Sequence, residues 1–392
     1  MARQRRTTIC REGWYYLLVL ALVFGGAMLR ELNLLLVVAG LLLGPLLFNW
    51  RSVVHTLQGL EIQRKVPQGI CAGDLLVASV SLHNQRPRIG SWAVVVEDQV
   101  QRESNGAGEA PLCPSVLFPY VAAGQSSRGL YRGRLVRRGL YRLGPLKVST
   151  HFPFGLLRRT ILLGKSETLT VFPRLGRLAA GWITRQHEAF EGTHRRERRH
   201  GPDGDFYGLR PWRSGDSRRW IHWRSSARVG GLVVRQFEQP RNRDVAVLLD
   251  LWQPEQPAES DLENVELAVS FAATLATELC RTGGGTLWLG TVGRPPEFHS
   301  GPASLVLLQD VMRRLAVAEA QHGDHLPELL EHALREIEPG SEIILVGTRP
   351  VDLSDTARFA RLGADPAQRG AARRIRCVDA SSHEFSQYFQ VE

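Results

Sequence analysis

The chain has 392 residues, of which 43% are hydrophobic, and its 49 basic against 39 acidic residues give a formal net charge of +10. This length accommodates two or three domains, and the apolar fraction excludes a largely disordered chain. The five cysteines are scattered without a CxxC pair, which excludes a disulfide framework and indicates a reducing compartment. All but three of the basic residues are arginine, a bias typical of a GC-rich genome, so arginine content alone does not indicate binding.

Two uncharged apolar runs lie near the start of the sequence, at residues 14–29 and 34–50. Each approaches the roughly 20 residues that cross a bilayer as a helix, and the polar break between them is short enough for a tight turn. Arginines precede and follow the pair, whereas the turn has no net charge. The positive-inside rule therefore predicts a transmembrane hairpin in the cell (inner) membrane, with a basic cytoplasmic tail at 1–13 and both termini in the cytoplasm. The alternative is a helical hairpin buried in a soluble protein.

Residues 61–175 contain short runs of alternating or continuous apolar residues, at 75–84, 91–98, 129–150 and 166–173. β-Branched and aromatic residues recur in these runs, and Gly and Pro separate them, which is typical of strands joined by turns. The spacing predicts an Ig-like β-sandwich. Six arginines lie between residues 128 and 142, and we expect them on the exposed face of a hairpin; ligand binding is the alternative.

Residues 176–240 are predicted to connect two domains, and they hold the most distinctive stretch of the sequence. The stretch 208–238 combines seven arginines with three tryptophans and ends in an apolar, strand-like run. Around it, residues 195–243 hold 13 arginines against five acids, a local net charge of +8. Residues 195–205 are charged and contain glycine, as expected for a loop.

Residues 241–392 show alternating strand and helix patterns. Apolar strands are predicted at 244–252, 286–292, 341–348 and 374–380, with helices after the first strand and near 302–319 and 325–338. Ser260 and Glu263 have the spacing of a capping box, which would begin the first of these helices. Continuous apolar strands between helices are typical of an open, mostly parallel α/β sheet that is covered on both faces.

Three segments together resemble the bacterial protein family known as domain of unknown function 58. They are the N-terminal hairpin, the run RGLYRLGPLKVSTHFPFGLLRR at 138–159 followed by TVFPRL at 170–175, and the stretch 208–238. The resemblance implies a membrane-anchored protein with a von Willebrand factor type A-like domain at 241–392. It also implies a MoxR-type AAA+ ATPase as partner and a noncatalytic adaptor or scaffold function in protein maturation or complex assembly.

The type A domain family binds a divalent cation through an Asp-x-Ser-x-Ser loop after its first strand, because hydroxyl and carboxylate oxygens suit a hard cation. Here the matching residues begin at Asp250, and Trp252 and Pro254 replace both hydroxyls. At a later strand end, Arg349 would oppose a cation. We therefore expect no metal at this degenerate loop and no cofactor, and we expect Asp250 to accept hydrogen bonds from loop N–H groups.

The candidate partner-binding residues all come from the stretch 208–238: Arg210, Trp212, Gly215, Asp216, Arg218, Arg219, His222, Trp223 and Arg228. One interpretation is architectural: Asp216 pairs with Arg218 or Arg219, and Trp220 and Trp223 pack between the domains. The other is a surface for an anionic partner, because arginine binds carboxylates and phosphates in a bidentate way. His222 is expected to be a packed side chain rather than a pH sensor.

The leading functional hypothesis is a cytoplasm-facing protein-interaction module that the hairpin holds at the membrane. The alternative is an anionic-surface binder that contacts acidic lipid or nucleic acid through residues 195–243, with nucleic acid the less favoured partner because no nucleic-acid-binding fold is recognised. An enzyme is not expected, since the sequence contains no GxSxG, HExxH or phosphate-loop motif. Cys280 lies among apolar residues of a predicted helix, so a nucleophilic role is not expected for it.

Overall fold

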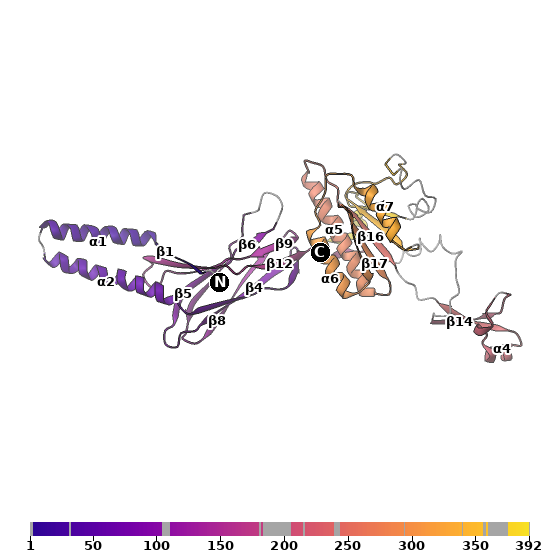
Figure 1. The fold of residues 1–392 in the computed structure, drawn as a ribbon, viewed down its shortest axis with the longest axis horizontal. Helices are drawn as coiled ribbons and strands as arrows, with labels where there is room; N and C mark the ends of the chain where they lie inside the picture. Colours follow the sequence, from indigo (N-terminus) through magenta and orange to yellow (C-terminus); the bar gives the residue numbers. More distant parts are fainter. Residues whose placement is uncertain are drawn as a thin grey trace. The chain divides into compact units, whose positions relative to one another are not determined.

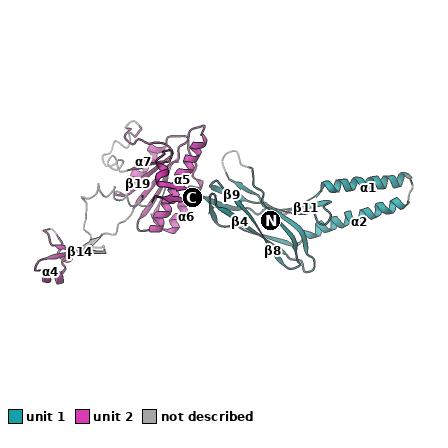
Figure 2. Cartoon of the chain, turned by 180° about the vertical axis from the view of Figure 1, so that it is seen from behind, with its two compact units in different colours: residues 1–172 teal, residues 173–392 magenta. Residues whose placement is uncertain are grey.

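A computed structural model of the chain describes residues 3–30, 33–103, 110–179, 182, 205–214, 216–238, 244–293, 295–338, 340–355, 358–359 and 375–391. The chain divides into two compact units, Met1–Phe172 and Pro173–Glu392 (Figure 2). Each unit has its own hydrophobic core, the first between β-sheets and the second between an α/β sheet and its helices.

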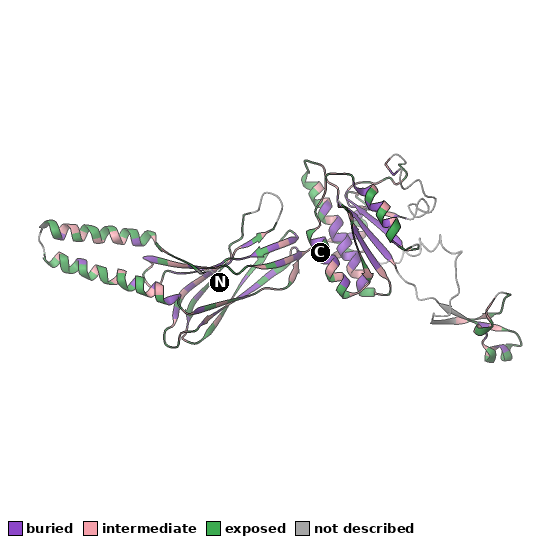
Figure 3. Ribbon diagram, in the orientation of Figure 1, coloured by how far each residue is buried: buried purple, intermediate pink, exposed green. Residues whose placement is uncertain are grey.

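Two long helices, α1 (Arg11–Arg30) and α2 (Asn33–Thr56), form a hairpin in the first unit (Figure 1). Both are long and apolar enough to cross a membrane, and many of their apolar side chains are exposed (Figure 3). The phenol of Tyr16 in α1 donates a 2.7 Å hydrogen bond to the carbonyl oxygen of Leu42 in α2. The two predicted apolar runs are therefore confirmed as helices, and α2 continues beyond its apolar run, which ends at Trp50.

A strand, β1 (Arg3–Ile9), precedes the hairpin and pairs antiparallel with β11 (Leu157–Leu163). The basic tail expected at residues 1–13 is therefore wrong for residues 3–9. An edge strand is held by backbone hydrogen bonds to a single neighbour, so its Arg and Thr side chains can face solvent without an apolar pattern. This pairing ties the chain on both sides of the hairpin to the same domain.

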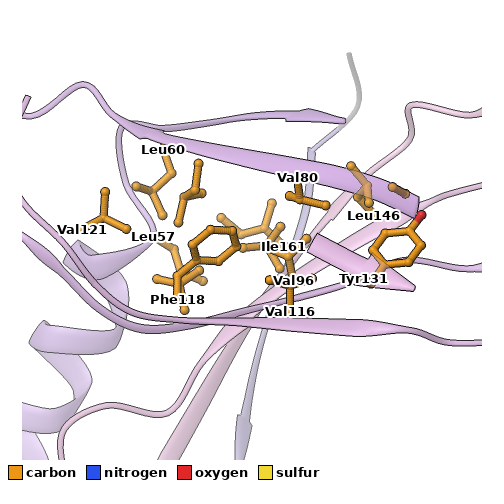
Figure 4. Close-up of a cluster of buried hydrophobic side chains, with 14 residues drawn as sticks. Leu57, Leu60, Val80, Val96, Val116, Phe118, Val121, Tyr131, Leu146 and Ile161 are labelled. Atoms are coloured by element: carbon orange, nitrogen blue, oxygen red, sulfur yellow. The ribbon is translucent and has the colours of Figure 1, made fainter. Parts of the chain in front are cut away.

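The rest of the first unit is a β domain whose sheets have the orders β1-β11-β10-β5-β7, β2-β4-β8 and β3-β12-β9-β6. Its other strands are β2 (Leu60–Lys65), β3 (Gly69–Cys71), β4 (Leu75–Asn84), β5 (Ser91–Glu97), β6 (Val100–Arg102), β7 (Ser115–Val121), β8 (Ser126–Arg134), β9 (Gly139–Leu143), β10 (Leu146–Thr150) and β12 (Glu167–Phe172). Side chains from two sheets, including Val80, Phe118 and Leu146, meet in one buried cluster (Figure 4). The predicted packing of β-sheets in this region is confirmed.

The six arginines at 128–142 do not lie on one hairpin, contrary to what the sequence predicted. β8 pairs with β4, β9 pairs with β12 and β6, and β10 pairs with β5 and β11. The physical reason is that Tyr131 and Tyr141 bury their rings in two different hydrophobic clusters, so the two halves of the segment join different sheets. The six arginines at 128–142 consequently lie on no common hairpin face.

A buried ion pair joins the sheets of the β domain. Arg64 Nη1 donates hydrogen bonds of 2.8 and 2.9 Å to the two oxygens of Asp98, and the two side chains are only 0% and 1% exposed. Arg64 Nη2 also donates to the Leu143 carbonyl oxygen at 3.1 Å, and the Tyr131 hydroxyl donates to Asp98 at 2.6 Å. Burial, reinforced by the bond to Asp98, raises the pKa of the Tyr131 phenol. Because the charges are buried, removing one partner alone is strongly unfavourable.

The second unit contains an α/β domain with a five-stranded sheet of order β18-β17-β16-β19-β20, in which β18 alone runs antiparallel to its neighbour. Its strands are β16 (Val245–Asp250), β17 (Thr286–Thr291), β18 (Glu297–Pro302), β19 (Glu342–Gly347) and β20 (Arg376–Asp379), and its helices are α5 (Glu259–Thr282), α6 (Leu305–Val317) and α7 (Leu326–Glu336). Every residue of β16 is buried, because α7 and α5 cover opposite faces of the sheet (Figure 1). The predicted mostly parallel sheet between helices is confirmed.

Helix α5 begins at Glu259, so Ser260 lies inside the helix and the predicted capping box is wrong. Ala258 is the N-cap residue, and its N–H donates a 2.9 Å hydrogen bond to the Asp261 carboxylate. Asp261 therefore satisfies the N–H of the N-cap residue, whereas the expected box would have joined Glu263 to the N–H of Ser260.

The connector expected at 176–240 begins later than predicted, because β13 (Gly176–Leu178) pairs with β21 (Phe389–Val391) beside the short helix α9 (Phe385–Tyr388). The Gly176 N–H donates a 2.9 Å hydrogen bond to Thr274 Oγ1 in α5. The ring of Trp182 lies 5.3 Å from that of Phe271, also in α5. These residues cover a face of α5 that the central sheet leaves open.

Candidate functional site: the Arg/Trp module and the carboxyl edge of the α/β sheet

Residues 205–238, which we name the Arg/Trp module, fold as two antiparallel strands with a folded loop between them. The strands are β14 (Asp205–Pro211) and β15 (Val233–Glu238), and the loop contains the 3-10 turn η1 (Arg218–Trp220) and the short helix α4 (Trp223–Val229) (Figure 1). The Trp212 N–H donates to the Leu232 carbonyl oxygen and the His222 N–H to that of Val233, each at 2.8 Å. Backbone bonds thus fold the loop back onto the strand that follows it.

Arg210 and Asp216 form a bidentate ion pair within the module. The two guanidinium nitrogens of Arg210 donate to the two carboxylate oxygens of Asp216 at 2.7 and 2.6 Å. Asp216 also accepts the Arg213 N–H at 2.7 Å, which closes the turn after β14. The expected pairing of Asp216 with Arg218 or Arg219 is therefore wrong, because the hairpin brings β14 beside the turn and leaves those two arginines exposed.

His222 is the N-cap residue of α4 and is partly exposed. Its Nδ1 accepts the Ser225 N–H at 3.2 Å at the start of α4. The next serine, Ser226, accepts the Val233 N–H at 2.9 Å and donates its hydroxyl to the His222 carbonyl oxygen at 3.1 Å. These bonds fix α4 against β15.

The other candidate residues lie on exposed parts of the module. Trp223 is 67% exposed and Trp212 is 36% exposed, and Val229 and Leu232 are 72% and 45% exposed. Exposed arginines accompany them at positions 218, 219, 224 and 228. Gly215 lies outside the described residues. Within the module, Trp223 is not covered by neighbouring side chains.

Few of the module's described side chains are buried. Among its described side chains, only Ile221, Val234 and Ser226 are buried. A two-stranded hairpin is marginally stable by itself, and segments below about 40 residues usually need a metal, a disulfide or a docking partner. The exposed apolar residues beside the arginines are the natural place for such a partner.

A second group of polar residues meets at the carboxyl edge of the α/β sheet. Asp250 ends β16, and Thr348 and Arg349 follow β19, which is the parallel neighbour of β16. Loops that leave neighbouring parallel strands at such an edge commonly form ligand sites. We name Asp250, Trp252, Asp324, Arg349 and Arg358 the carboxyl-edge cluster.

Asp324 lies between the two arginines of the cluster. It accepts hydrogen bonds from Arg349 Nη2 at 2.7 Å and from Arg358 Nε and Nη2 at 2.8 Å. The hydrogen bonds from Arg358 hold the pKa of Asp324 below its ordinary value, and Arg349 adds to the effect. Arg349 also stacks on Trp252, with its guanidinium carbon 4.6 Å from the ring centroid.

Asp250 has no such partner for one of its oxygens. Its side chain is 1% exposed, and among the described residues Oδ2 accepts no hydrogen bond; Arg349 Nη2 lies 3.7 Å away. The expected N–H bonds from the loop are therefore missing at this oxygen. Burial raises the pKa of Asp250, and the neighbouring Arg349 opposes the shift only in part.

The chemistry of the cluster is that of ion pairing. A guanidinium of the protein itself faces Asp250, where the degenerate loop lacks the hydroxyls of a cation site. In the described part of the chain, no three His, Cys, Asp or Glu side chains are grouped closely enough to hold a metal ion. Neither observation assigns a reaction to this edge.

Sequence reasoning identified Asp250, Trp252 and Arg349 but missed Asp324 and Arg358. Asp324 lies between α6 and α7 and Arg358 lies after β19, so no local spacing joins them to Asp250. One signal was present: the polar run from His322 to His325 separates two apolar helical patterns and so marks a loop.

Comparisons with known proteins support the family resemblance. Residues 208–346 match the family model described as "Protein of unknown function DUF58". The chain is similar to the uncharacterized protein YeaD of Bacillus subtilis (strain 168), with 20% identity over 311 residues that cover 78% of this chain and 75% of YeaD.

Solved structures show only weak likeness. The CARDB domain of the PF1109 protein from Pyrococcus furiosus is 13% identical over 29% of this chain and 93% of that domain, with a TM-score of 0.17. The superoxide reductase (neelaredoxin) of Ignicoccus hospitalis is 14% identical over 28% of this chain and 79% of its own, with a TM-score of 0.20. At these scores neither likeness carries a functional conclusion.

Proposed function

We propose that this chain, which belongs to the DUF58 family, is a noncatalytic protein-interaction module that its helical hairpin anchors in the membrane. The observation that carries the proposal is the exposure of Trp223, Val229 and Leu232 on a short module built on two strands. Such a module needs a partner to complete its fold. Trp and Arg, which surround this face, are the residue types that dominate binding energy at protein interfaces.

The proposed location is the cell (inner) membrane, with α1 and α2 as two spans and both termini in the cytoplasm. Exposed apolar side chains along both helices support the spans. Arg11 begins α1 and Arg51 follows the apolar part of α2, which places positive charge at the domain end of both helices. By the positive-inside rule, the domains that follow the hairpin face the cytoplasm.

The two folded domains are proposed to be scaffolds: an Ig-like β-sandwich and a von Willebrand factor type A-like domain. The mostly parallel sheet with Asp250 at the end of its first strand supports the second assignment. In this proposal the pairing of Arg349 with Asp250 and Asp324 replaces the metal of the type A family, so the domain works without a cofactor.

The proposed partner is a MoxR-type AAA+ ATPase, and the proposed role is that of an adaptor in protein maturation or complex assembly. This identity rests on the family resemblance. The chemistry of the module fits a partner with an acidic and apolar surface, because seven arginines accompany three acids between residues 205 and 238. Complementary charge raises association rates, and the resulting binding weakens as salt increases.

A pull-down from native membranes tests the proposal, with the tagged full-length chain as bait in the presence and absence of ATP. The variant Arg218→Ala/Arg219→Ala/Trp223→Ala removes exposed side chains of the module. The control variant Arg132→Ala/Arg134→Ala/Val136→Ala removes two exposed arginines and one exposed apolar side chain from the β domain. We expect an AAA+ ATPase with the wild type and the control but not with the module variant; equal recovery by all three would contradict the proposal.

A second candidate function is binding to an anionic surface, which the net charge of +8 over residues 195–243 favours. Acidic lipid attracts basic segments at the cytoplasmic leaflet, and nucleic acid would give binding that falls steeply with salt. Recovery of lipid or nucleic acid without an ATPase, lost in the module variant, would establish this function instead.

A further inference from the structure

The end of the β domain next to the hairpin carries exposed aromatic side chains that the proposed function does not use. Trp92 in β5 is 46% exposed, Tyr120 in β7 is 47% exposed, and Phe154 in the β10–β11 loop is 51% exposed. The Trp92 ring lies 4.2 Å from that of Tyr120 and stacks on that of Phe152 at 5.6 Å. We name Trp92, Tyr120, Phe152 and Phe154 the aromatic end.

Contacts with α2 set the level of the aromatic end relative to the hairpin. The rings of Phe154 and Phe48 lie 6.1 Å apart, and the Leu157 N–H donates a 3.0 Å hydrogen bond to Asn49 Oδ1. Phe48 lies within the apolar run of α2, and Arg51 is the first charged residue after that run. Three helical residues rise about 4.5 Å, so Phe154 packs at a level inside the apolar part of the hairpin.

The junction between the hairpin and the β domain is held by many contacts rather than by a flexible linker. The Arg86 guanidinium donates to the carbonyl oxygens of His55 at 2.6 Å and Thr56 at 3.4 Å, at the C-terminal end of α2. On the other side, the Cys10 N–H donates to the Leu156 carbonyl oxygen at 2.9 Å, just before α1. The aromatic end therefore keeps its position relative to both helices.

Basic side chains surround the aromatic end. Exposed arginines lie at the start of α1, in α2, in the β4–β5 loop and at the start of β11: Arg11, Arg51, Arg88 and Arg158. Two acids, Glu12 and Glu61, lie at the same end of the domain, so positive charge predominates. Aromatic rings with adjacent arginines are the side chains found where a protein meets the boundary between lipid headgroups and acyl chains.

We propose that the aromatic end is a lipid-binding surface of the β domain, with Phe154 entering the apolar layer, Trp92 and Tyr120 at the headgroup level, and the arginines on lipid phosphates. This inference rests on the proposed membrane span of α1 and α2 and goes beyond it. It gives a function to the FPFG run at 152–155, which belongs to the family resemblance but has no part in the Arg/Trp module. The consequence is that the β domain sits on the membrane in one fixed orientation.

Site-specific photo-cross-linking of the full-length chain in its native membrane tests the inference. p-Benzoylphenylalanine replaces Phe154 or Ile89, which is 57% exposed in the β4–β5 loop. The matched control position is Val136, which is 61% exposed and lies beyond the opposite end of β4, about 30 Å away for a ten-residue strand. Leu36 in the hairpin serves as the positive control for lipid contact.

We expect phospholipid adducts, seen as a mass shift, at positions 154, 89 and 36 and none at 136. Lipid adducts at 36 without any at 154 and 89 would overturn the lipid-binding surface while leaving the membrane span intact. Protein adducts at 154 and 89 would also overturn it, because a protein would then cover the aromatic end. Absence of lipid adducts at 36 would instead contradict the proposed span itself.

Discussion

Asp250 gives the sharpest test of how charge is arranged at the carboxyl edge of the sheet. The substitution Asp250→Asn keeps the shape of the side chain and removes its charge. Because burial raises the pKa of Asp250 despite Arg349, its surroundings favour the neutral form. We therefore expect Asp250→Asn to stabilise the α/β domain at neutral pH.

The size of the effect follows from Oδ2 of Asp250, which accepts no hydrogen bond from the described residues. A buried polar group without a partner costs about 1–3 kcal/mol. The variant also loses the attraction between Asp250 and Arg349 at 3.7 Å, although Arg349 keeps its 2.7 Å contact with Asp324. We expect the unfolding free energy of the domain to rise by about 1 kcal/mol. The unfolded fraction, and with it hydrogen exchange through global opening, should then fall roughly fivefold.

The stabilisation by Asp250→Asn should depend on pH and be largest above the folded pKa of Asp250. For a carboxyl whose folded pKa is raised, the protonated group contributes stability below its unfolded pKa, which is near the ordinary value of 3.8. That contribution is lost as pH rises through the folded pKa. Burial is the largest cause of the raised pKa of Asp250; the charge of Asp324 adds to it, and Arg349, Arg358 and His325 oppose it. The advantage of Asp250→Asn over the wild type should therefore shrink as pH falls below the folded pKa.

Hydrogen-exchange mass spectrometry of the full chain measures this effect in peptides that cover β16 and β19, comparing the proteins at the same pH. The matched control is Asp324→Asn, for which the opposite sign is expected because Arg358 and Arg349 hold the pKa of Asp324 down. Because the Asp324 carboxylate is partly exposed, we expect Asp324→Asn to lower the unfolding free energy by only about 1 kcal/mol. Faster exchange in Asp250→Asn than in the wild type would refute the reasoning.

Three further changes test other contacts. Arg210→Ala removes the bidentate partner of Asp216, and we expect the module to lose about 1.5–3 kcal/mol of stability. Limited proteolysis should then cleave the turn that follows β14 faster than in the wild type; unchanged cleavage would contradict this. Arg64→Leu leaves Asp98 buried without a cation and should lower the unfolding free energy of the β domain by about 3–5 kcal/mol in chemical denaturation, whereas Arg64→Leu/Asp98→Leu should recover most of it. Arg86→Ala should speed hydrogen exchange at 53–58 by about tenfold, a loss of roughly 1.4 kcal/mol, and unchanged exchange would show that the guanidinium does not hold the end of α2.

Local patterns explain which elements the sequence could predict. The continuous apolar run of β16 and the apolar runs of α1 and α2 depend on neighbouring residues alone, and the structure confirms them. In the Arg/Trp module, the density of Arg and Trp marked the right segment. The role of His222 as the N-cap of α4 was not predicted, because it depends on how the loop folds back onto β15.

Long-range pairing explains what the sequence could not predict. β1 depends on β11, more than 140 residues away, and its Arg-rich pattern is that of a tail unless this partner is known. Asp216 had arginines within three residues, yet the hairpin register gave it Arg210 from the preceding strand. Asp324 and Arg358 reach the carboxyl-edge cluster only because parallel strands end at one edge of the sheet.

The central claim is that the Arg/Trp module is completed by a protein partner. The most direct test places p-benzoylphenylalanine at Trp223, whose side chain is 67% exposed, in the full-length chain in native membranes. We predict a covalent adduct with an AAA+ ATPase that disappears when Arg218→Ala/Arg219→Ala is added. An adduct with lipid or nucleic acid alone, or an ATPase adduct that survives the removal of both arginines, would contradict the account.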